Sequence, residues 1–345
     1  MNSHQHTINA FEALGQLFRE HNNSEKRNYD WNEHLDNALI KSSNQNKWFT
    51  KNNLDFCVNS WGKTLTKASI TKWLSAYPSA QKHQQRLGLV LAGNIPLVGL
   101  HDVLCGLACG YSIEIKHSSN DNVLLPFVVN FLLEIHSEWN GSIHFSEGRL
   151  EKFDRVIATG SSNTARYFEY YFKNVPNIIR KTRNGVAVLD GSESNEDLAL
   201  LCIDIMQYFG LGCRSVSHLI VPEGYDFTLL FESLYEHREI IHHNAYANNY
   251  DYNKAVYLMQ EIELLDNGFI LLKKDNGLNS PIACIHYSTY KDQDELNHVL
   301  ETQKDQIQCV ASKNSALGVT FGQTQYPKLN DYADHIDTMA FLLKK

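Results

Sequence analysis

A cysteine in a glycine-bounded turn is the residue best placed for chemistry. Cys213 lies in the segment FGLGCRSVSHLIVPEG, after an expected helix over 193–209 and before an expected apolar strand over 217–224. Glycine adopts backbone conformations that other residues avoid, so Gly210 and Gly212 would let a substrate approach the thiol closely. A thiolate is both a nucleophile and a good leaving group, which predicts covalent catalysis. The alternative is a small buried hydrophobic residue, because cysteines near helix ends often have that role.

Three further polar segments follow expected strands in the first half of the chain. Asn94 follows LGLVLAG, Lys116 lies near the end of YSIEIKHS, and a turn of Gly160, Ser161 and Ser162 follows RVIAT. A turn that opens a helix offers N–H groups and the positive end of the helix dipole to phosphate. The turn is therefore a candidate phosphate site, but it lacks the full G-x-G-x-x-G pattern, and a serine that only caps the helix is the alternative. A solvated lysine at a strand end is the alternative for Lys116.

The elements that must position these residues alternate between strands and helices. In the first half, strands are expected over 87–93, 111–118, 142–146 and 155–160, and helices over 96–109, 122–139 and 161–174. In the second half, strands are expected over 217–224, 267–275, 280–290 and 307–312, and helices over 193–209, 226–240 and 294–303. Pro96 is expected to open its helix and Gly110 to end it. This alternation predicts an α/β protein with doubly wound parallel sheets, whose ligands bind beyond the carboxyl ends of the strands.

Composition and charge limit the function. The formal net charge of −8 argues against nucleic acid as a partner, since phosphate backbones need a basic surface. The seven cysteines form no C-x-x-C pair and no cluster with histidine or acidic residues, so we expect no metal site and a reducing cytoplasm. The most apolar window, 123–135, is interrupted by Asn130 and Glu134 and is too short to span a bilayer. With no secretory signal at the N-terminus, we expect a soluble cytoplasmic protein.

Four parts are expected along the chain. They are an N-terminal helical cap over 1–80, a nucleotide-cofactor-binding α/β domain over 81–185, a catalytic α/β domain over 186–312, and a tail over 313–345 that returns across the cofactor domain. Because no low-complexity linker separates the two α/β domains, we expect them to pack closely, with Cys213 at their junction. The segment HNAYANNYDYNKA after the helix 226–240 is expected to be a polar, aromatic loop that precedes another helix, and no role is assigned to it.

Taken in order, the segments LAGNIPLVG, IEIKHSS, VIATGSSNTAR and FGLGCRSVSHLIVPEG resemble the aldehyde dehydrogenase superfamily. That superfamily carries an Asn-x-Pro turn, a Lys-Pro-Ser turn, a Thr-Gly-Ser turn and a Gly-Gln-x-Cys turn in the same order. The chain most resembles its fatty acyl-CoA reductases, the group that includes the bacterial luminescence fatty-acid reductase. The resemblance covers residues 85–340 and implies two doubly wound α/β domains. It also implies an NADPH-dependent reduction of a long-chain fatty acyl thioester to an aldehyde.

The resemblance implies a role for each candidate residue. Cys213 would attack the carbonyl of a fatty acyl-CoA, or of another activated acyl donor, and form an S-acyl enzyme. Asn94 would donate its side-chain amide to the developing oxyanion. Lys116 would contact the adenosine ribose of NADPH or its 2′-phosphate. The pyrophosphate would lie at Gly160 and Ser161, with Ser162 as a neighbouring candidate.

Two departures from the superfamily pattern matter. Aldehyde dehydrogenases carry a Glu-Leu-Gly-Gly segment whose glutamate activates water, but the corresponding segment here is IIRKTRNGVAV, which has no carboxylate. Slow hydrolysis of the acyl enzyme favours a reductase. The Glu-Ile-Phe-Gly-Pro segment is also missing, and the chain reads GLNSPIACI around Pro281. No residue is therefore assigned to the nicotinamide ribose. The proton donor is also unassigned, with His218, His242 and His243 considered and a surface or packed histidine as the alternative for each.

Three other functions remain open from the sequence. They are a cysteine-dependent acyltransferase that performs no reduction, an NAD(P)-dependent aldehyde dehydrogenase, and a binding module without catalysis. The resemblance further implies an acyl-activating protein as a partner and a homo-oligomer as the assembled form. Discharge of the acyl enzyme by reduced nicotinamide distinguishes the reductase from the acyltransferase.

Overall fold

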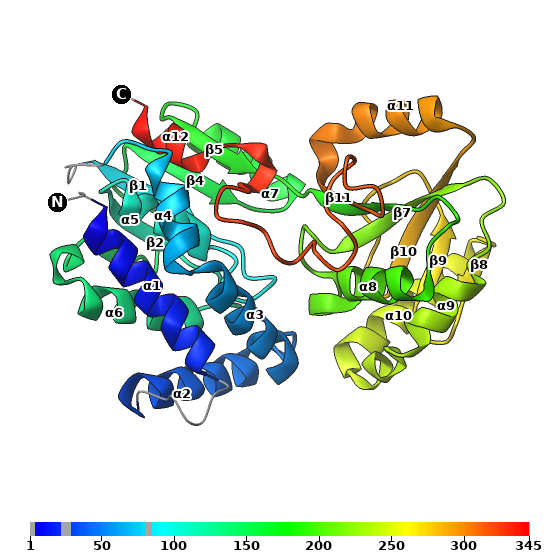
Figure 1. Ribbon diagram of the computed structural model, residues 1–345, viewed down its shortest axis with the longest axis horizontal. Coiled ribbons are helices and arrows are strands. Elements are labelled where there is room, and N and C mark those ends of the chain that lie inside the picture. Colours follow the sequence, from blue (N-terminus) through cyan, green and yellow to red (C-terminus); the bar gives the residue numbers. More distant parts are fainter. Residues whose placement is uncertain (1–3, 22–28, 80–84, 345) are drawn as a thin grey trace. The chain divides into compact units, whose positions relative to one another are not determined.

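The chain folds into two compact units of alternating strands and helices. The structure, a computed structural model, describes residues 4–21, 29–79 and 85–344. The first unit contains Met1–Lys181 and Pro327–Lys345, and the second contains Thr182–Tyr326 (Figure 1). No helix in these described ranges is long and apolar enough to cross a membrane.

The first unit is built on a five-stranded parallel sheet. Its strands are β1 (Arg86–Val90), β2 (Ser112–Lys116), β3 (Ile143–Phe145), β4 (Arg155–Thr159) and β5 (Asn177–Arg180). The strand order is β3-β2-β1-β4-β5, and every neighbouring pair is parallel. The order reverses at β1, because the chain continues to β2 on one side and returns to β4 on the other. This reversal is the position at which doubly wound sheets bind ligands.

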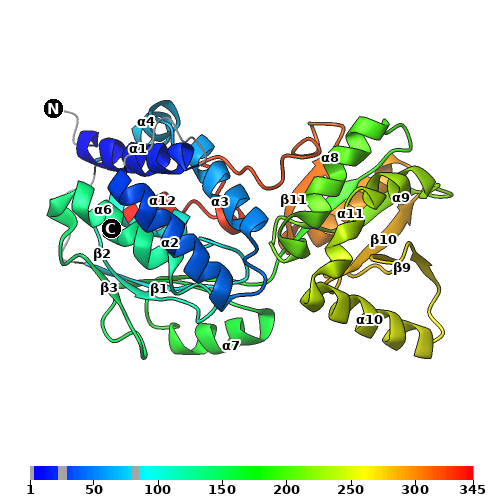
Figure 2. The ribbon, with the colours of Figure 1, turned by 90° about the horizontal axis from the view of Figure 1, so that it is seen from below.

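Helices cover both faces of this sheet. Their bounds are α5 (Leu100–Ala108), α6 (Leu124–Ile135), α7 (Ser162–Tyr171) and α12 (Thr338–Leu343), with a short 3-10 helix at Ser137–Trp139. Figure 2 shows α7 on one face and α6 and α12 on the other. The crossover through α7 therefore passes on the opposite side from the crossover through α6, which confirms the predicted doubly wound arrangement.

The N-terminal residues form helices, as the sequence predicts. These are α1 (Gln5–Glu20), α2 (Tyr29–Gln45), α3 (Lys51–Thr64) and α4 (Lys67–Ser75). The apolar face of α1, which includes Phe11, Leu14 and Phe18, is buried, and the helix packs against α3, α4 and α6. The helices therefore belong to the same compact unit as the first sheet. The predicted boundary between residues 80 and 81 lies outside the described residues.

The second unit is built on a six-stranded sheet. Its strands are β6 (Asn184–Val188), β7 (Val216–Pro222), β8 (Leu264–Asp266), β9 (Leu271–Lys274), β10 (Cys284–Tyr290) and β11 (Ile307–Ser312). The order is β11-β6-β7-β10-β9-β8, and all pairs are parallel except β8 with β9. Its helices are α8 (Asn195–Met206), α9 (Thr228–Tyr235), α10 (Asn244–Met259) and α11 (Gln293–Gln303). The second α/β sheet is thus confirmed, with an antiparallel edge strand that was not predicted.

The two units divide the chain differently from the predicted domains. The division falls after Lys181 rather than after residue 185, because β6 is already a strand of the second sheet. The predicted tail over 313–345 is also split. Its residues up to Tyr326 belong to the second unit, and those from Pro327 onward belong to the first. The position of Cys213 at a domain junction stays a prediction.

Two local predictions are wrong. The segment HNAYANNYDYNKA is not a loop, because α10 begins at Asn244 and runs to Met259. A ring nitrogen of His243 caps this helix by accepting the Tyr246 N–H, and Ala245, Tyr246 and Tyr250 form a buried face at helical spacing. Pro96 does not open α5, which begins at Leu100.

Candidate active site

Cys213 differs from the other cysteines in its exposure. All seven lie in described parts of the chain, and Cys213 alone is exposed. Burial raises the pKa of Cys109, Cys202 and Cys284 to about 12, and that of Cys105 well above its ordinary value. A thiol with such a pKa forms almost no thiolate at neutral pH and is an inert packing residue. The alternative of a buried packing thiol therefore describes the other cysteines and does not describe Cys213.

A sharp reversal of the backbone precedes Cys213. After α8 ends at Met206, Tyr208, Phe209 and Gly210 follow one another in the left-handed region, with φ of 55°, 57° and 75°. The left-handed conformation costs a residue with a side chain roughly 1–2 kcal/mol. The glycine avoids that cost, but Tyr208 and Phe209 do not. The turn is therefore strained, and contacts elsewhere must stabilise it.

The N-terminus of α10 supplies some of these contacts. The Phe209 ring lies 4.4 Å from the His243 ring and 6.1 Å from the Tyr246 ring, measured between centroids. Tyr246 is buried, and its N–H donates to His243 Nδ1 at 3.3 Å. The segment beginning HNAY, which had no predicted role, therefore packs against the turn that carries Cys213.

The predicted catalytic residue Asn94 and the predicted cofactor residues lie at one edge of the first sheet. Val90 of β1 pairs with Lys116 of β2 and with Ala158 of β4, so all three strands end at the same level. Asn94 follows β1, and Lys116 is the exposed last residue of β2. The turn at 160–162 follows β4. The structure thus brings Asn94, Lys116 and this turn to the carboxyl edge, where ligands of such sheets bind.

Close packing fixes the turn that contains Asn94. A Cβ at Gly93 would lie 2.6 Å from the Ser118 Cβ, which is closer than any side chain tolerates. The turn then passes through Leu97, whose φ is 53° and whose N–H donates to Asp121 Oδ2 at 2.9 Å. Asp121 is 7% exposed, and burial raises its pKa to about 6. This strained turn explains why Pro96 does not begin the helix.

A second contact to the same turn comes from the N-terminal helices. The Cys57 thiol of α3 donates to the Pro96 carbonyl at 3.3 Å. Sequence reasoning found neither Cys57 nor Asp121, because no local pattern links them to a turn 24 or more residues away. Helix α3 thus helps to hold the Asn94 turn.

The turn after β4 combines a helix cap with an anion-binding end. Ser161 Oγ accepts the Thr164 N–H at 3.3 Å and caps α7, which is the capping role considered for this serine. The Gly160 N–H donates to the Arg180 carbonyl at 3.2 Å. Because Thr164 donates to the cap, the donors that the first turn of α7 offers to a phosphate are the N–H groups of Ser162 and Asn163, with the positive helix dipole behind them. A helix N-terminus of this kind can bind an anion, and the exposed Lys116 lies at the same edge of the sheet.

The predicted histidine candidates have different environments. His218 is 1% exposed, and its two ring nitrogens lie 3.2 Å from the Gly277 carbonyl and 2.8 Å from Ser288 Oγ. Burial lowers its pKa to about 4, so it is a neutral core residue of the second sheet. His242 is exposed and lies 3.4 Å from Glu239. Among the described residues, no group of three or more His, Cys, Asp or Glu side chains is arranged to hold a metal ion.

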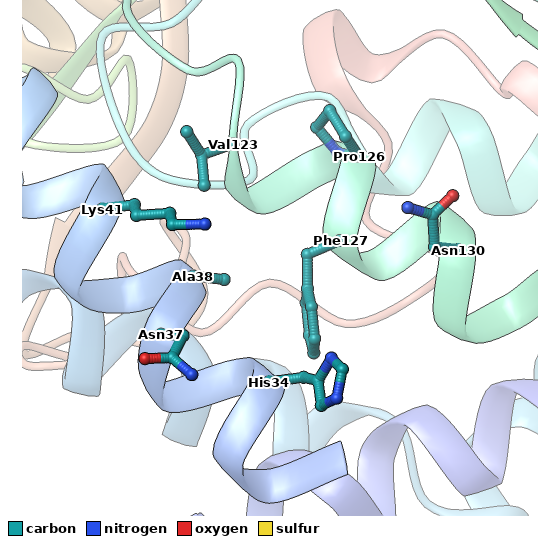
Figure 3. A pocket seen from close by; sticks show the side chains of 8 residues that line it. All are labelled: His34, Asn37, Ala38, Lys41, Val123, Pro126, Phe127 and Asn130. Atoms are coloured by element: carbon teal, nitrogen blue, oxygen red, sulfur yellow. The ribbon is translucent and has the colours of Figure 1, made fainter. Parts of the chain in front are cut away.

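A separate cavity lies between α2 and α6 in the first unit. It has a volume of about 550 Å³, and Figure 3 shows the Lys41 side chain extending toward α6. Its lining combines apolar and polar side chains: His34, Asn37, Ala38, Lys41, Val123, Pro126, Phe127 and Asn130. None of the predicted site residues lines it, so it is not part of the candidate active site.

Comparisons with known proteins support the fold. No protein-family model and no curated protein matches the sequence. Among solved structures, aldehyde dehydrogenase 21 of Physcomitrella patens, in complex with succinate, matches with a TM-score of 0.67 and 12% identity over 100% of this chain and 85% of that one. A NAD-dependent benzaldehyde dehydrogenase of Corynebacterium glutamicum matches with a TM-score of 0.65 and 13% identity over 92% and 78%. An indole-3-acetaldehyde dehydrogenase in complex with NAD+ has a TM-score of 0.61 and 11% identity over 92% and 74%. The chain therefore has the fold of the aldehyde dehydrogenases.

Proposed function

We propose that the chain is an NADPH-dependent reductase that converts a long-chain fatty acyl-CoA into the fatty aldehyde through an S-acyl intermediate on Cys213. One observation carries the proposal: within an aldehyde-dehydrogenase-like fold, Cys213 alone among seven cysteines is exposed, on a strained turn before β7. An exposed nucleophile that closely follows strained backbone, here Tyr208 and Phe209, is typical of a functional site. The sequence motifs supply the choice of acyl-CoA and NADPH.

The chemistry proceeds in two balanced steps. The Cys213 thiolate attacks the thioester carbonyl, the carbon–sulfur bond to coenzyme A breaks, and coenzyme A leaves as a thiolate that takes up a proton. The bound cofactor supplies a hydride for the second step. The acyl group on Cys213 accepts that hydride and a proton, and the resulting thiohemiacetal releases the aldehyde and restores the thiol.

Residues of the first unit have supporting roles in this proposal. Asn94 donates its amide to the oxygen that gains charge during attack, and loss of one such donor typically lowers the rate ~100-fold or more. Lys116 binds the adenosine ribose or its 2′-phosphate. The turn of Gly160, Ser161 and Ser162 binds the pyrophosphate through the first turn of α7. An acyl-activating protein as donor and a homo-oligomeric form are further parts of the proposal.

An aldehyde dehydrogenase is the second candidate, because the solved structures that match carry that name. Oxidation of an aldehyde to the acid requires a base that activates water for hydrolysis of the acyl enzyme. The segment from β5 through β6, residues 177–188, contains no Asp or Glu. Slow hydrolysis of the acyl enzyme therefore favours the reductase.

The test is the intact mass of the protein after incubation with a long-chain acyl-CoA, first without and then with NADPH. We expect one acyl adduct on the native protein and on Cys309→Ala, none on Cys213→Ala, and loss of the adduct with release of aldehyde when NADPH is added. An adduct that survives NADPH would favour an acyltransferase. Equally fast conversion of aldehyde and NAD(P)+ to free acid would favour the dehydrogenase. No adduct with any activated acyl donor would refute the role of Cys213.

A further inference from the structure

A buried carboxylate in α8 binds a distant part of the chain. Asp204 is fully buried, and its oxygens accept the Gly322 N–H at 2.6 Å, the Thr324 N–H at 3.1 Å and the Thr324 hydroxyl at 2.7 Å. An ionised carboxylate is costly to bury unless several donors satisfy it. Here all three donors come from one short segment, residues 322–325, which we term the strap.

The strap also contacts the turn that carries Cys213. The Thr324 carbonyl accepts a hydrogen bond from Arg214 Nε. The next strap residue, Gln325, donates its side-chain amide to Ser215 Oγ at 3.3 Å. Thr324 and Ser215 are almost completely buried, with 0% and 1% exposure. The two residues that directly follow Cys213 are therefore both bonded to the segment that Asp204 holds.

We propose that the strap fixes the position of the Cys213 thiol, and that Asp204 and Thr324 are positioning residues for it. The proposal rests on the function proposed above, in which Cys213 is the nucleophile. Residues 208 and 209 are strained, and a strained conformation persists only where the surrounding structure holds it. The aromatic contacts of Phe209 act before the cysteine, and the strap acts after it. A displacement of ~1 Å in a nucleophile can lower its rate ~100-fold.

The backbone of the strap suits this role. Gly322 has φ of 78°, and a Cβ there would lie 2.9 Å from the Leu200 side chain of α8. The glycine thus lets the strap approach α8 closely enough for Asp204 to accept its N–H. Asp204, which anchors the strap, lies near the end of α8, and Arg214 and Ser215 lie just before β7. Because the strap is bonded to all three residues, a shift of the strap would also move residues 214 and 215.

The test compares Thr324→Val with Thr324→Ser. Valine keeps the size of threonine but loses the hydroxyl that donates to Asp204, whereas serine keeps it. Thr302→Val is the control for the substitution itself, because it removes an exposed threonine hydrogen bond, from Thr302 Oγ1 to the His298 carbonyl at 2.7 Å, on α11 of the same unit. Asp204→Asn is a more severe variant, and its possible failure to fold does not affect the comparison of the threonine variants.

Two measurements decide the outcome. In Thr324→Val we expect hydrogen exchange of the peptide covering 207–216 to rise about fivefold, as expected for the loss of one hydrogen bond, while Thr324→Ser and Thr302→Val match the native protein. We expect the rate constant for acylation of Cys213 to fall with an unchanged KM for acyl-CoA. Unchanged hydrogen exchange in folded Thr324→Val would refute the proposal that the strap positions the Cys213 thiol. Raised exchange with an unchanged acylation rate would also refute it. If the native protein forms no acyl adduct, the proposed function fails, whereas the exchange measurement still tests the strap.

Discussion

Acid should destabilise the second unit through His218. The neutral ring of this buried histidine donates from Nδ1 to the Gly277 carbonyl and accepts at Nε2 from Ser288 Oγ. Protonation would reverse the hydrogen bond with Ser288 and place a charge in a buried site. Its pKa falls from the ordinary 6.5 to about 4, mainly through burial. The charged groups and histidines that face it include His286, whose pKa is also lowered by burial, and Asp275, which partly offsets the effect.

The direction and size of this change in stability follow from the coupling between proton binding and folding. A group whose pKa is lower in the folded state favours folding above its unfolded pKa, and that contribution is lost as the pH falls from 6.5 toward 4. From pH 7 to pH 5, His218 alone should lower the free energy of unfolding of the second unit by about 2 kcal/mol. His286, whose pKa burial also lowers, changes the stability of the second unit in the same direction.

The assay is urea unfolding at pH 7 and pH 5, followed by pulse hydrogen exchange of peptides from β7. His218→Asn should unfold at lower urea than the native protein at pH 7 but lose about 2 kcal/mol less between the two pH values. His242→Asn is the control, because it makes the same substitution at an exposed histidine of the same unit. An unchanged pH difference in folded His218→Asn would contradict the inference that burial keeps His218 neutral.

In the first unit, Asp121 should have the opposite effect, because a fall in pH should raise the free energy of unfolding through this residue. Burial raises its pKa from 3.8 to about 6, so the charged form costs about 3 kcal/mol at pH 7. That cost disappears as the pH falls from 6 to 4. Asp121→Asn keeps an oxygen for the Leu97 N–H and should stabilise the unit at pH 7 by about 1–3 kcal/mol. All five tryptophans lie in the first unit, so fluorescence reports its unfolding. Lower stability of Asp121→Asn at pH 7 would refute this reasoning.

Two further pairs of substitutions test packing and hydrogen bonding. Gly93→Ala places a Cβ 2.6 Å from that of Ser118 and should lower the free energy of unfolding by about 1–3 kcal/mol, whereas Gly148→Ala, with no heavy atom within 4 Å of its Cβ, should have a smaller effect. Equal losses in urea unfolding would contradict the close approach. The buried Tyr246 hydroxyl has no hydrogen-bond partner among the described residues, so Tyr246→Phe should raise thermal stability slightly. Tyr332→Phe should lower it, because the hydroxyl there accepts from Trp73 Nε1 at 2.8 Å, and the opposite order would refute the hydrogen-bond assignment.

The sequence was sufficient to predict the alternating elements and the edge of the first sheet that carries Asn94 and Lys116. Apolar runs of strand length and glycine or polar turns are local signals, and parallel pairing brings the ends of such strands together. The same local reasoning failed for α10. Its first turns are rich in Asn and Tyr, which have modest helix propensity, and the helix is stabilised by the His243 cap and the burial of Tyr246 and Tyr250.

The positioning contacts could not be predicted for a different physical reason. Gly210 and Gly212 indicate a turn at Cys213, but they do not indicate which residues stabilise the left-handed Tyr208 and Phe209. In our proposal, the contact that holds the turn after Cys213 joins Arg214 to Thr324, which lies 110 residues further along the chain. Residues that perform chemistry need a particular side chain in a particular turn and therefore leave a local pattern. Residues that hold such a turn need only a donor or acceptor at the right point in space, and the completed fold supplies that point.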